Sequence, residues 1–598
     1  CSFDEKTFEI SSAVAAKEAS EDGIHWTYAP MVDICRDARW GRMCEGFGED
    51  TYLASQYSAA TVRGFQGDDI SHPDHIAACV KHFAAYGACE GGRDYDTVDM
   101  SMPKFYETYL PPYAAAIKAG AATVMAAFND LNGIPCTTNK WLLKTLLRDE
   151  LGFDGFVISD AHAIEECVNH GTARDLREAV KQSVEAGCDM DLGSDAYITL
   201  LEDMIKKGEI SEEDLDNSVR AVLRIKFSLG LFERPYVEIR KESSKLCAEH
   251  RAIALDIARK SAVLLKNEGN LLPLGKKTRV AVVGAVAADR DEVIGAWCCS
   301  DIKGTGVSLI DALEIKGINF KYAPCVSEQE PLDYEMLADT VKDADVVIAA
   351  LAYKSSGEAR SMANLELSDS QQEMLIELGK TGKPVVGVLF NGRPIALGAV
   401  VPRVSALLEA WHLGTETGNA VADILFGDYN PTGRLSATIP HISSQLPVYY
   451  NHPNTGRPAD DNIRWSSKYM DVSVKPLYPF GYGLSYTDYS YRNLAVRTEG
   501  DALYVSVDVK NIGKKAGSET VQLYVHRRKA TRVRPVRELK GYSKVFLEPG
   551  EEKNVTIKIT REDMGYYDVM MNYITDVSEY DVWMAHDSSC GEHGTVIF

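Results

Sequence analysis

Six polar residues end apolar stretches in the first third of this 598-residue chain. They are Asp33, Lys81, His82, Asn129, Asp160 and Asp191. A carboxylate fixed at the end of a buried strand can act as a nucleophile or a base, and a neighbouring lysine or histidine can donate hydrogen bonds to a polar substrate. Such a carboxylate can equally cap the following helix, so residue type alone leaves both roles open for Asp160.

The stretches that carry these residues are predicted to be buried parallel strands, because they are short, apolar and separated by helical patterns. They span residues 26–33, 75–83, 122–130, 155–162 and 187–194. One intervening helix is expected to begin near Asn139 and end at Gly152, which suit its two caps. This alternation indicates a (β/α) barrel over residues 1–232, and barrels carry their functional residues at the carboxyl ends of the strands.

Two further domains are expected after a linker near residues 233–247. Apolar stretches at 279–285, 345–352, 384–390 and 406–411, separated by helices, predict an α/β sandwich with a mainly parallel sheet over residues 248–485. Residues 486–598 alternate between apolar and polar without helical patterns, which predicts a fibronectin type III-like β-sandwich.

Charge and motif content disfavour several classes of partner. The 64 Lys and Arg residues against 87 Asp and Glu give a net charge of −23, which disfavours nucleic acid. No apolar run reaches the roughly 18 residues of a membrane span. The segment RVAVVGAVAADR lacks the GxGxxG spacing of a dinucleotide site, and the histidines and cysteines show no metal-ligand spacing, so neither cofactor nor metal is expected.

Thirteen scattered cysteines without a CxxC motif predict reduced thiols and a cytoplasmic location. The sequence begins with Cys1 rather than Met and shows no signal peptide at its start. If an N-terminal segment were missing, a periplasmic or secreted location would also be open.

Five stretches together resemble glycoside hydrolase family 3 and occur in the order of that family. They are RDARWGRMCEGFGED, CVKHFAAYG, GFVISDA, LFGDYNPTGRL and PLYPFGYGLSYT. The resemblance covers essentially the whole chain and implies a three-domain retaining β-glycosidase. Such an enzyme needs one carboxylate that is held ionised and one carboxyl group that can donate a proton.

The resemblance implies a role for each candidate residue. Asp160 matches the nucleophile, and Glu358, in a loop of the second domain, matches the general acid/base, with Glu366 as the alternative. The substrate-binding positions match Arg42, Lys81, His82 and Tyr95, whereas a Lys-His pair on its own would suit an exposed surface equally well. Arg93 lies in the loop of Tyr95. For Asn129 and Asp191, structural capping is about as good an explanation as a role in the site, so neither is assigned to the catalytic set.

The sequence departs from the family pattern at two places. An Asp in a DAVHG-like motif, which the family uses in its sugar site, is absent, so the barrel is expected to lack its N-terminal strand or strands. Residues 26–33 should then pair on one side only, and we favour a fragment over a truncated barrel. Ala161 and His162 follow Asp160 where many members carry a Trp that forms a wall of the +1 site.

The function expected from this resemblance is that of an exo-β-glucosidase, which releases glucose from the non-reducing end of β-linked glucosides or oligosaccharides. A β-xylosidase or another β-glycosidase is the alternative within the family. An inactive carbohydrate-binding relative is the alternative from another class. Neither nucleic acid nor a membrane is an expected partner, and a homodimer is left open.

Overall fold

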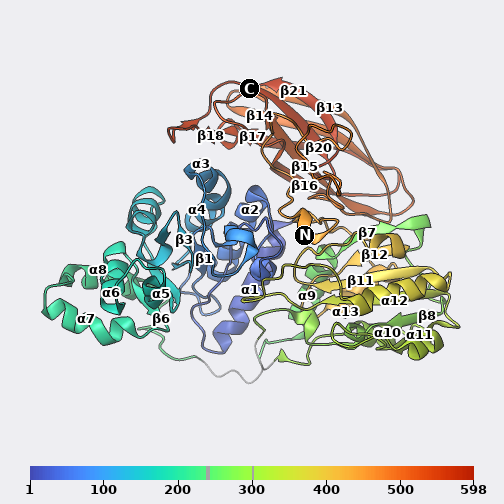
Figure 1. Ribbon diagram of the computed structural model, residues 1–598, viewed down its shortest axis with the longest axis horizontal. Coiled ribbons are helices and arrows are strands. Elements are labelled where there is room, and N and C mark those ends of the chain that lie inside the picture. The colour runs from blue at the N-terminus through green and yellow to red at the C-terminus, as the bar shows by residue number, and fades with distance from the viewer. Residues whose placement is uncertain (238–242, 299–301) are drawn as a thin grey trace. The chain divides into compact units, whose positions relative to one another are not determined.

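The computed structural model describes residues 1–237, 243–298 and 302–598 (Figure 1). The chain divides into two compact units. We call Asp4–Cys35 with Glu45–His250 the barrel unit, and Cys1–Phe3, Arg36–Cys44 and Arg251–Phe598 the C-terminal unit. The three domain boundaries stated above stay a prediction. No helix in the described ranges is long and apolar enough to cross a bilayer.

A four-stranded parallel sheet forms the centre of the barrel unit. Its order is β1 (Cys79–Phe83), β2 (Thr123–Ala126), β5 (Phe156–Ala161) and β6 (Met190–Leu192). The helices of this unit are α1 (Glu5–Glu21), α2 (Thr51–Gln66), the consecutive α3, η4 and α4 (Met102–Lys104, Phe105–Tyr109, Leu110–Lys118), η6 (Trp141–Glu150), α5 (Ala163–Asn169), α6 (Leu176–Ala186), α7 (Ala196–Lys206) and α8 (Glu212–Ser228). The predicted alternation of strand and helix is confirmed.

Local sequence explains where helix η6 begins and ends. The Asn139 side chain accepts a hydrogen bond from the Leu142 amide at 3.1 Å, just before η6. Gly152 follows that helix with φ +71°, a conformation that glycine adopts without steric cost. Both predicted caps are therefore present, and the helix itself has π-type hydrogen bonding.

Residues 26–33 were expected to form a regular strand, and that expectation is wrong. The segment makes only isolated parallel bridges, between Trp26 and Ala77 and between Met31 and Lys81. Pro30 has no amide hydrogen to donate, so a continuous ladder cannot form. Within the fully described residues 1–237, the bridges of this segment lie on the β1 side alone, as predicted for one-sided pairing, and the sheet is open.

The first sheet of the C-terminal unit has six strands and is mainly parallel, as predicted. Its order is β7 (Val263–Asn267), β12 (Ala406–Glu409), β11 (Val385–Asn391), β10 (Val346–Tyr353), β8 (Val280–Val283) and β9 (Phe320–Ala323). β7 alone pairs antiparallel. After β8 the chain enters a 3₁₀ turn, η8 (Ala285–Ala288), so no α-helix begins there.

Helices cover both faces of this sheet. All eight residues of β10 are buried, and alternate ones, such as Ile348 and Ala350, share one core with α10 (Leu309–Ile315) and α13 (Thr417–Leu425). Burial of both faces accounts for the nearly continuous apolar sequence of the strand. The remaining helices are α9 (Ala248–Ser261), α11 (Tyr334–Val341) and α12 (Asp369–Lys380).

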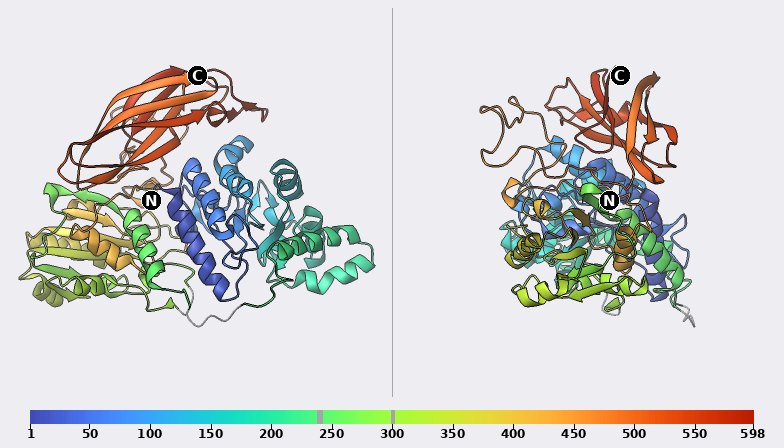
Figure 2. Two further views of the ribbon diagram at one scale, coloured as in Figure 1. Left: turned by 180° about the vertical axis from the view of Figure 1, so that it is seen from behind. Right: turned by 90° about the vertical axis from the view of Figure 1, so that its right-hand side faces the viewer.

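The C-terminal strands form the predicted antiparallel β-sandwich (Figure 2). One sheet contains β13 (Tyr489–Glu499), β14 (Ala502–Asn511) and β17 (Glu552–Thr560). The other contains β16 (Glu538–Leu547), β15 (Gly517–Arg527), β20 (Glu579–Ala585) and β21 (Glu592–Ile597). Every second residue of β14 is buried, and these side chains meet those of the facing sheet in one core.

Candidate active site

Asp160 lies at the carboxyl end of the barrel-unit sheet, as the second-last residue of β5. Its side chain is nearly buried, with 7% of the residue exposed. One carboxylate oxygen, Oδ1, accepts a hydrogen bond from the Ala161 amide at 2.8 Å. The other, Oδ2, lies 3.5 Å from Nε2 of His82. The carboxylate is therefore fixed by the strand and faces an imidazole.

His82 is fully buried and is oriented by a chain of hydrogen bonds. Its Nδ1 lies 2.9 Å from Oδ2 of Asp33, and its backbone amide donates to the same oxygen at 3.0 Å. The Tyr113 hydroxyl donates to Oδ1 of Asp33 at 2.5 Å, and burial beside Asp33 raises the pKa of that phenol well above its ordinary value. Donation from Nδ1 to Asp33 leaves Nε2 directed at Asp160.

Lys81 is largely buried and lies next to an acidic side chain. Its Nζ is 4.0 Å from Oε2 of Glu45, and the Lys81 side chain is 13% exposed. Lys81 lies in strand β1, directly before His82, whose side chain faces Asp160. The alternative reading of the Lys-His pair as exposed surface residues is therefore wrong.

Tyr95 belongs to a loop that contacts His82 through Tyr86. The Tyr86 ring packs edge-on against His82 with 5.2 Å between centroids, and its hydroxyl donates to Oδ1 of Asp94 at 2.5 Å. That hydroxyl also accepts from the Tyr95 amide at 3.1 Å. The Tyr95 ring packs against Phe128 and is 45% exposed. The loop therefore presents an aromatic surface near the buried imidazole.

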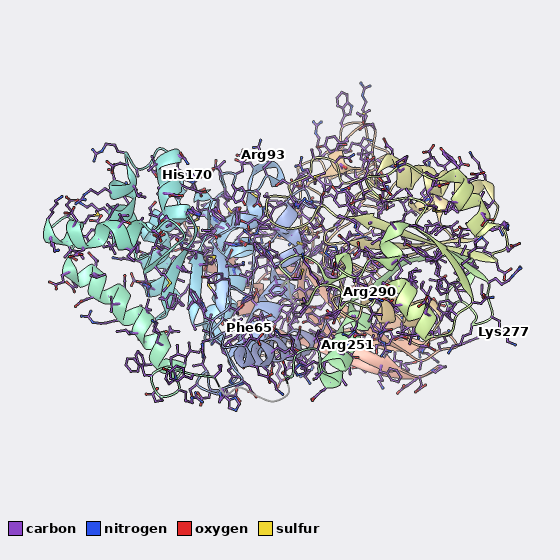
Figure 3. The ribbon with its side chains drawn as sticks, turned by 90° about the horizontal axis from the view of Figure 1, so that it is seen from below. Phe65, Arg93, His170, Arg251, Lys277 and Arg290 are labelled. Carbon is purple, nitrogen blue, oxygen red and sulfur yellow. The ribbon has the colours of Figure 1, made fainter. Side chains whose placement is uncertain are left out.

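Three neighbouring polar residues have structural or surface roles. Asp191 accepts from the Ser194 hydroxyl at 2.6 Å and from main-chain amides at the start of α7, which makes it a cap. Asn129 is buried and donates its amide hydrogens to main-chain carbonyl groups. Arg93 pairs with Asp96 at 2.5 Å and extends from the surface of its unit (Figure 3). Capping therefore accounts for Asp191, whereas the contacts of the Asn129 amide with the carbonyl groups of residues 84 and 130 are not those of a helix cap.

Glu358 lies in the loop after β10, in the C-terminal unit, where it meets Arg42. Its Oε1 is 3.4 Å from Nη1 of Arg42, and the two side chains are 25% and 2% exposed. The loop turns tightly, because Gly357 has φ +114° and Ala359 has φ +56°. The Gly357 amide donates to the carbonyl of Gly41 at 2.8 Å. Backbone contacts therefore hold the loop against the segment that carries Arg42.

A buried arginine joins the same two segments. Arg393 follows β11 and donates to the carbonyl oxygens of Ala38 at 3.2 Å, Arg39 at 2.8 Å and Arg360 at 2.6 Å. Gly41 is closely enclosed there, because an added Cβ would lie 2.2 Å from the Gly357 carbonyl oxygen. Arg393 is thus a positioning residue for the Glu358 loop.

Comparison with known protein families identifies two domains that together span most of the chain. Residues 3–225 match the glycosyl hydrolase family 3 N terminal domain, and residues 262–486 match the glycosyl hydrolase family 3 C-terminal domain. The chain belongs to glycosyl hydrolase family 3. Residues 519–588 match a fibronectin type III-like domain. The family and the three-part fold expected from the sequence are confirmed.

Several named enzymes are similar to the chain over nearly all of its length. A periplasmic beta-glucosidase of Salmonella typhimurium is 40% identical, over 99% of this chain and 83% of the relative. A beta-xylosidase of Formosa agariphila is 34% identical, over 97% of this chain and 84% of the relative. The crystal structure of a beta-glucosidase from Listeria innocua in complex with glucose is 41% identical, with a TM-score of 0.95 over 100% of this chain and 84% of that one.

The six predicted site residues of this family 3 chain fall into two groups. Asp160, Lys81, His82 and Tyr95 belong to the barrel unit, and Arg42 and Glu358 belong to the C-terminal unit. Glu366, the alternative acid/base, is partly exposed between the buried Leu365 and Leu367. His162 has φ +63° and lies 2.8 Å from Oε1 of Glu165, with about half of its side chain exposed.

Three residues of these networks were given no role from the sequence. Asp33 was noted at a strand end, and its place before the Lys-His strand was the available signal. Tyr113 lies within the apolar helix α4, where nothing in the sequence distinguishes it. Arg393 lies two residues after the buried strand β11, in FNGRP. A charged residue so close to a core strand was a signal that it has a buried partner.

Proposed function

We propose that the chain is a retaining β-glucosidase that releases glucose from the non-reducing end of β-linked glucosides or oligosaccharides. The observation that carries this proposal is the carboxylate of Asp160, fixed at a strand end 3.5 Å from a buried, oriented histidine in a family 3 chain. Relatives of the chain that are named beta-glucosidases support the choice of glucose.

In the first step, an oxygen of Asp160 attacks the anomeric carbon as the bond from that carbon to the leaving oxygen breaks. Glu358 gives its proton to the leaving oxygen, so the aglycone departs as a neutral alcohol. The product is a glycosyl ester on Asp160. Burial of Asp160 and its short contacts limit the motion that this attack requires.

In the second step, water attacks the anomeric carbon while Glu358 removes its proton. The ester bond to Asp160 breaks, and two inversions give net retention of configuration. We assign the binding of sugar hydroxyl groups to Lys81 and Arg42, which offer charged hydrogen-bond donors, and to Nε2 of His82, which accepts when the ring is neutral and donates when it is protonated. Tyr95 supplies an aromatic surface next to the ring.

A β-xylosidase is the second candidate, favoured by the Formosa relative. Xylose lacks the hydroxymethyl group of glucose, and one such group in a pocket changes kcat/KM by about 10 to 200-fold. Hydrolysis of p-nitrophenyl β-glucoside and β-xyloside at pH 6 distinguishes them. The proposal expects at least tenfold preference for the glucoside. Preference for the xyloside would support the second candidate, and hydrolysis of neither would support an inactive carbohydrate-binding protein.

The compartment and the oligomeric state stay predictions. The twelve cysteines that the structure describes are all free, which fits the cytoplasm, whereas the Salmonella relative is named as periplasmic. Osmotic-shock fractionation tests the predicted location. Size-exclusion chromatography with light scattering tests the homodimer.

A further inference from the structure

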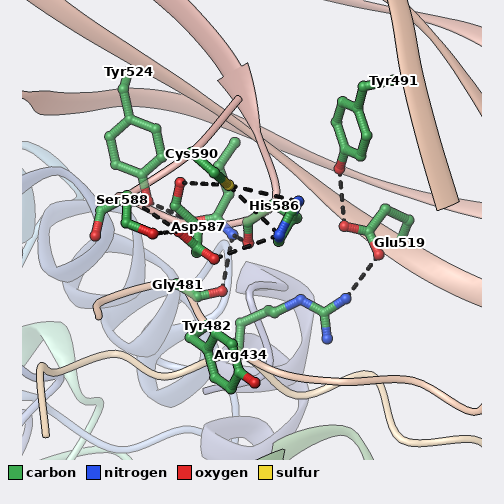
Figure 4. A network of polar contacts seen from close by, with 12 residues as sticks. Arg434, Gly481, Tyr482, Tyr491, Glu519, Tyr524, His586, Asp587, Ser588 and Cys590 are labelled. Carbon is green, nitrogen blue, oxygen red and sulfur yellow. Dashed lines mark hydrogen bonds and ion pairs between the residues drawn. The ribbon is translucent and has the colours of Figure 1, made fainter. Parts of the chain in front are cut away.

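The turn between β20 and β21 brings together three side chains that commonly bind metal ions. They are His586, Asp587 and Cys590, and we call residues 586–590 the HDSSC turn (Figure 4). The proposed glycosidase reaction uses none of them. The sequence analysis did not identify this group. The available signal was weak, since it was one histidine and one cysteine four residues apart.

The three ligand atoms lie close enough together to share one ion. Sγ of Cys590 lies 3.5 Å from Nε2 of His586, and that nitrogen lies 3.5 Å from Oδ2 of Asp587. All three atoms lie within 4.8 Å of one another. Zinc bound at about 2.3 Å from sulfur and about 2.0 Å from nitrogen and oxygen places neighbouring ligands roughly 3.3 to 3.6 Å apart. The two separations that involve Nε2 are close to these values. Sγ is also 3.6 Å from Nδ1 of His586, so the imidazole ring must turn to direct Nε2 at an ion that Cys590 binds.

Hydrogen bonds from neighbouring side chains to main-chain carbonyl groups hold the HDSSC turn in this form. The side-chain amide of Gln522 donates to the His586 carbonyl at 2.5 Å. Arg537 donates to the carbonyl groups of Ser588 at 2.9 Å and Cys590 at 2.7 Å. The backbone is therefore fixed before any ion binds, which lowers the entropy cost of binding.

The charge of Asp587 also favours a cation. The residue is 4% exposed, and Ser589 donates to its Oδ1 through both its amide and its hydroxyl at 2.7 Å. His586 is the ion-pair partner of Asp587 among the described residues, through Oδ2, and a neutral imidazole supplies no charge. The positive charge of Arg537 nearby disfavours a bound cation. The Asp587 carboxylate and the Cys590 thiolate together offset the two positive charges of a divalent ion.

We propose that the HDSSC turn binds one borderline-soft divalent cation, such as Zn²⁺, through His586, Asp587 and Cys590. Sulfur and imidazole ligands select Zn²⁺ or Co²⁺ over Mg²⁺ and Ca²⁺. Binding forms a bond from the metal to sulfur and releases the Cys590 thiol proton to solvent. Water occupies the fourth position, reached past the half-exposed His586 ring.

Titration of the full chain with Co²⁺ tests the site, because a thiolate bound to cobalt gives a near-ultraviolet charge-transfer band. We expect one equivalent to bind with that band, and Zn²⁺ to displace it. Cys590→Ser should abolish the band and His586→Ala should weaken binding at least tenfold. Cys247→Ser, a control at another partly exposed cysteine, should bind as the wild type does.

Absence of the band in the wild type, or its persistence in Cys590→Ser, would overturn the proposal. Circular dichroism checks that each variant is folded, and His586→Gln, at an exposed position, gives a second test if Cys590→Ser unfolds. Saturating Zn²⁺ should also raise the Tm of the wild type and leave that of Cys590→Ser unchanged. Hydrolysis of p-nitrophenyl β-glucoside should stay at the wild-type rate in each variant, which separates this proposal from the glycosidase assignment.

Discussion

The two candidate carboxyl groups are held in different ways. Asp160 lies on a strand and is 7% exposed. Its carboxylate accepts a hydrogen bond from the Ala161 amide and faces a buried histidine. Glu358 lies on a loop, has a side chain that is 25% exposed, and depends on Arg42 and on main-chain contacts with residues 38–41. A nucleophile must attack the anomeric carbon from a fixed direction, so a rigid position suits Asp160. A proton donor must reach leaving groups of different shapes, so a position on a loop suits Glu358.

This difference predicts how a substitution of each carboxyl group affects activity. A change at Asp160 should remove the reaction outright. A change at Glu358, or in the contacts that position its loop, should remove activity in proportion to how much the leaving group needs a proton.

The largest loss is expected for Asp160→Asn. A carboxamide cannot form the glycosyl ester, so kcat should fall by about 10⁴-fold or more. Asp191→Asn is the matched control, because Asp191 also ends a barrel strand but acts as a helix cap. Its kcat should stay within threefold of wild type. A residual rate for Asp160→Asn within tenfold of wild type would show that the nucleophile is another residue.

Glu358→Ala should slow hydrolysis of cellobiose-like substrates by about 10³-fold, the scale of general acid catalysis. Glycosylation by a dinitrophenyl β-glucoside should be spared, because that leaving group needs no proton. Azide, which needs no general base, should restore turnover and give a β-glucosyl azide.

Glu366→Ala is the control for this loop. It should resemble wild type on both substrates. The acid/base role would move to Glu366 on two results together. Glu358→Ala would lose equal activity on both substrates without azide rescue, and Glu366→Ala would lose activity only on substrates with poor leaving groups.

Gly41→Ala should produce a smaller loss with the same leaving-group signature. The new Cβ would meet the Gly357 carbonyl oxygen at 2.2 Å, so the loop must move, and a displacement near 1 Å can cost about 10²-fold. Gly379→Ala in α12 is the control, since nothing lies within 4 Å of its added Cβ. Equal losses on activated and unactivated substrates in Gly41→Ala would contradict a role in positioning Glu358.

The smallest effect on activity is expected at Glu409, a carboxyl group that ends strand β12 in the C-terminal unit. Burial raises its pKa to about 8. Between the ordinary value of about 4.3 and about 8 the folded chain binds one more proton than the unfolded chain, so this group makes stability fall as pH rises.

Glu409→Gln removes that titration. From pH 5 to pH 7.5, wild type should lose stability relative to the variant, by on the order of 1.4 kcal/mol per pH unit, in urea unfolding monitored by circular dichroism. The kcat of the variant should match wild type. Parallel stability curves would show that burial of Glu409 does not shift its titration, and a large fall in kcat would give this strand-end carboxyl group a part in the reaction.

Much of the fold could be predicted because its strands are buried on both faces or alternate regularly. The continuous apolar stretch of β10 and the alternation of β14 each dictate one layer arrangement. Residues 26–33 could not be predicted as well. Their apolar character indicates burial, which Met31 and Val32 show, but Pro30 prevents a regular ladder.

The candidate site was predictable where a strand end fixes a side chain, as for Asp160 and His82. The contacts that orient them were not, because Tyr113 reaches Asp33 from 80 residues along the chain. Likewise, Arg393 joins segments more than 350 residues apart in sequence, and such pairings follow from the tertiary fold alone.

The central claim is that Asp160 carries the glycosyl group. A 2-deoxy-2-fluoro-β-glucoside with a dinitrophenyl leaving group should trap that ester, because fluorine slows the second step more than the activated first step. Mass spectrometry of peptides from the wild-type protein should then show one added fluoroglucosyl group on Asp160, released when an acceptor alcohol is supplied. A label on any other residue, including Glu358, or turnover to the α-configured sugar without a label, would contradict the account.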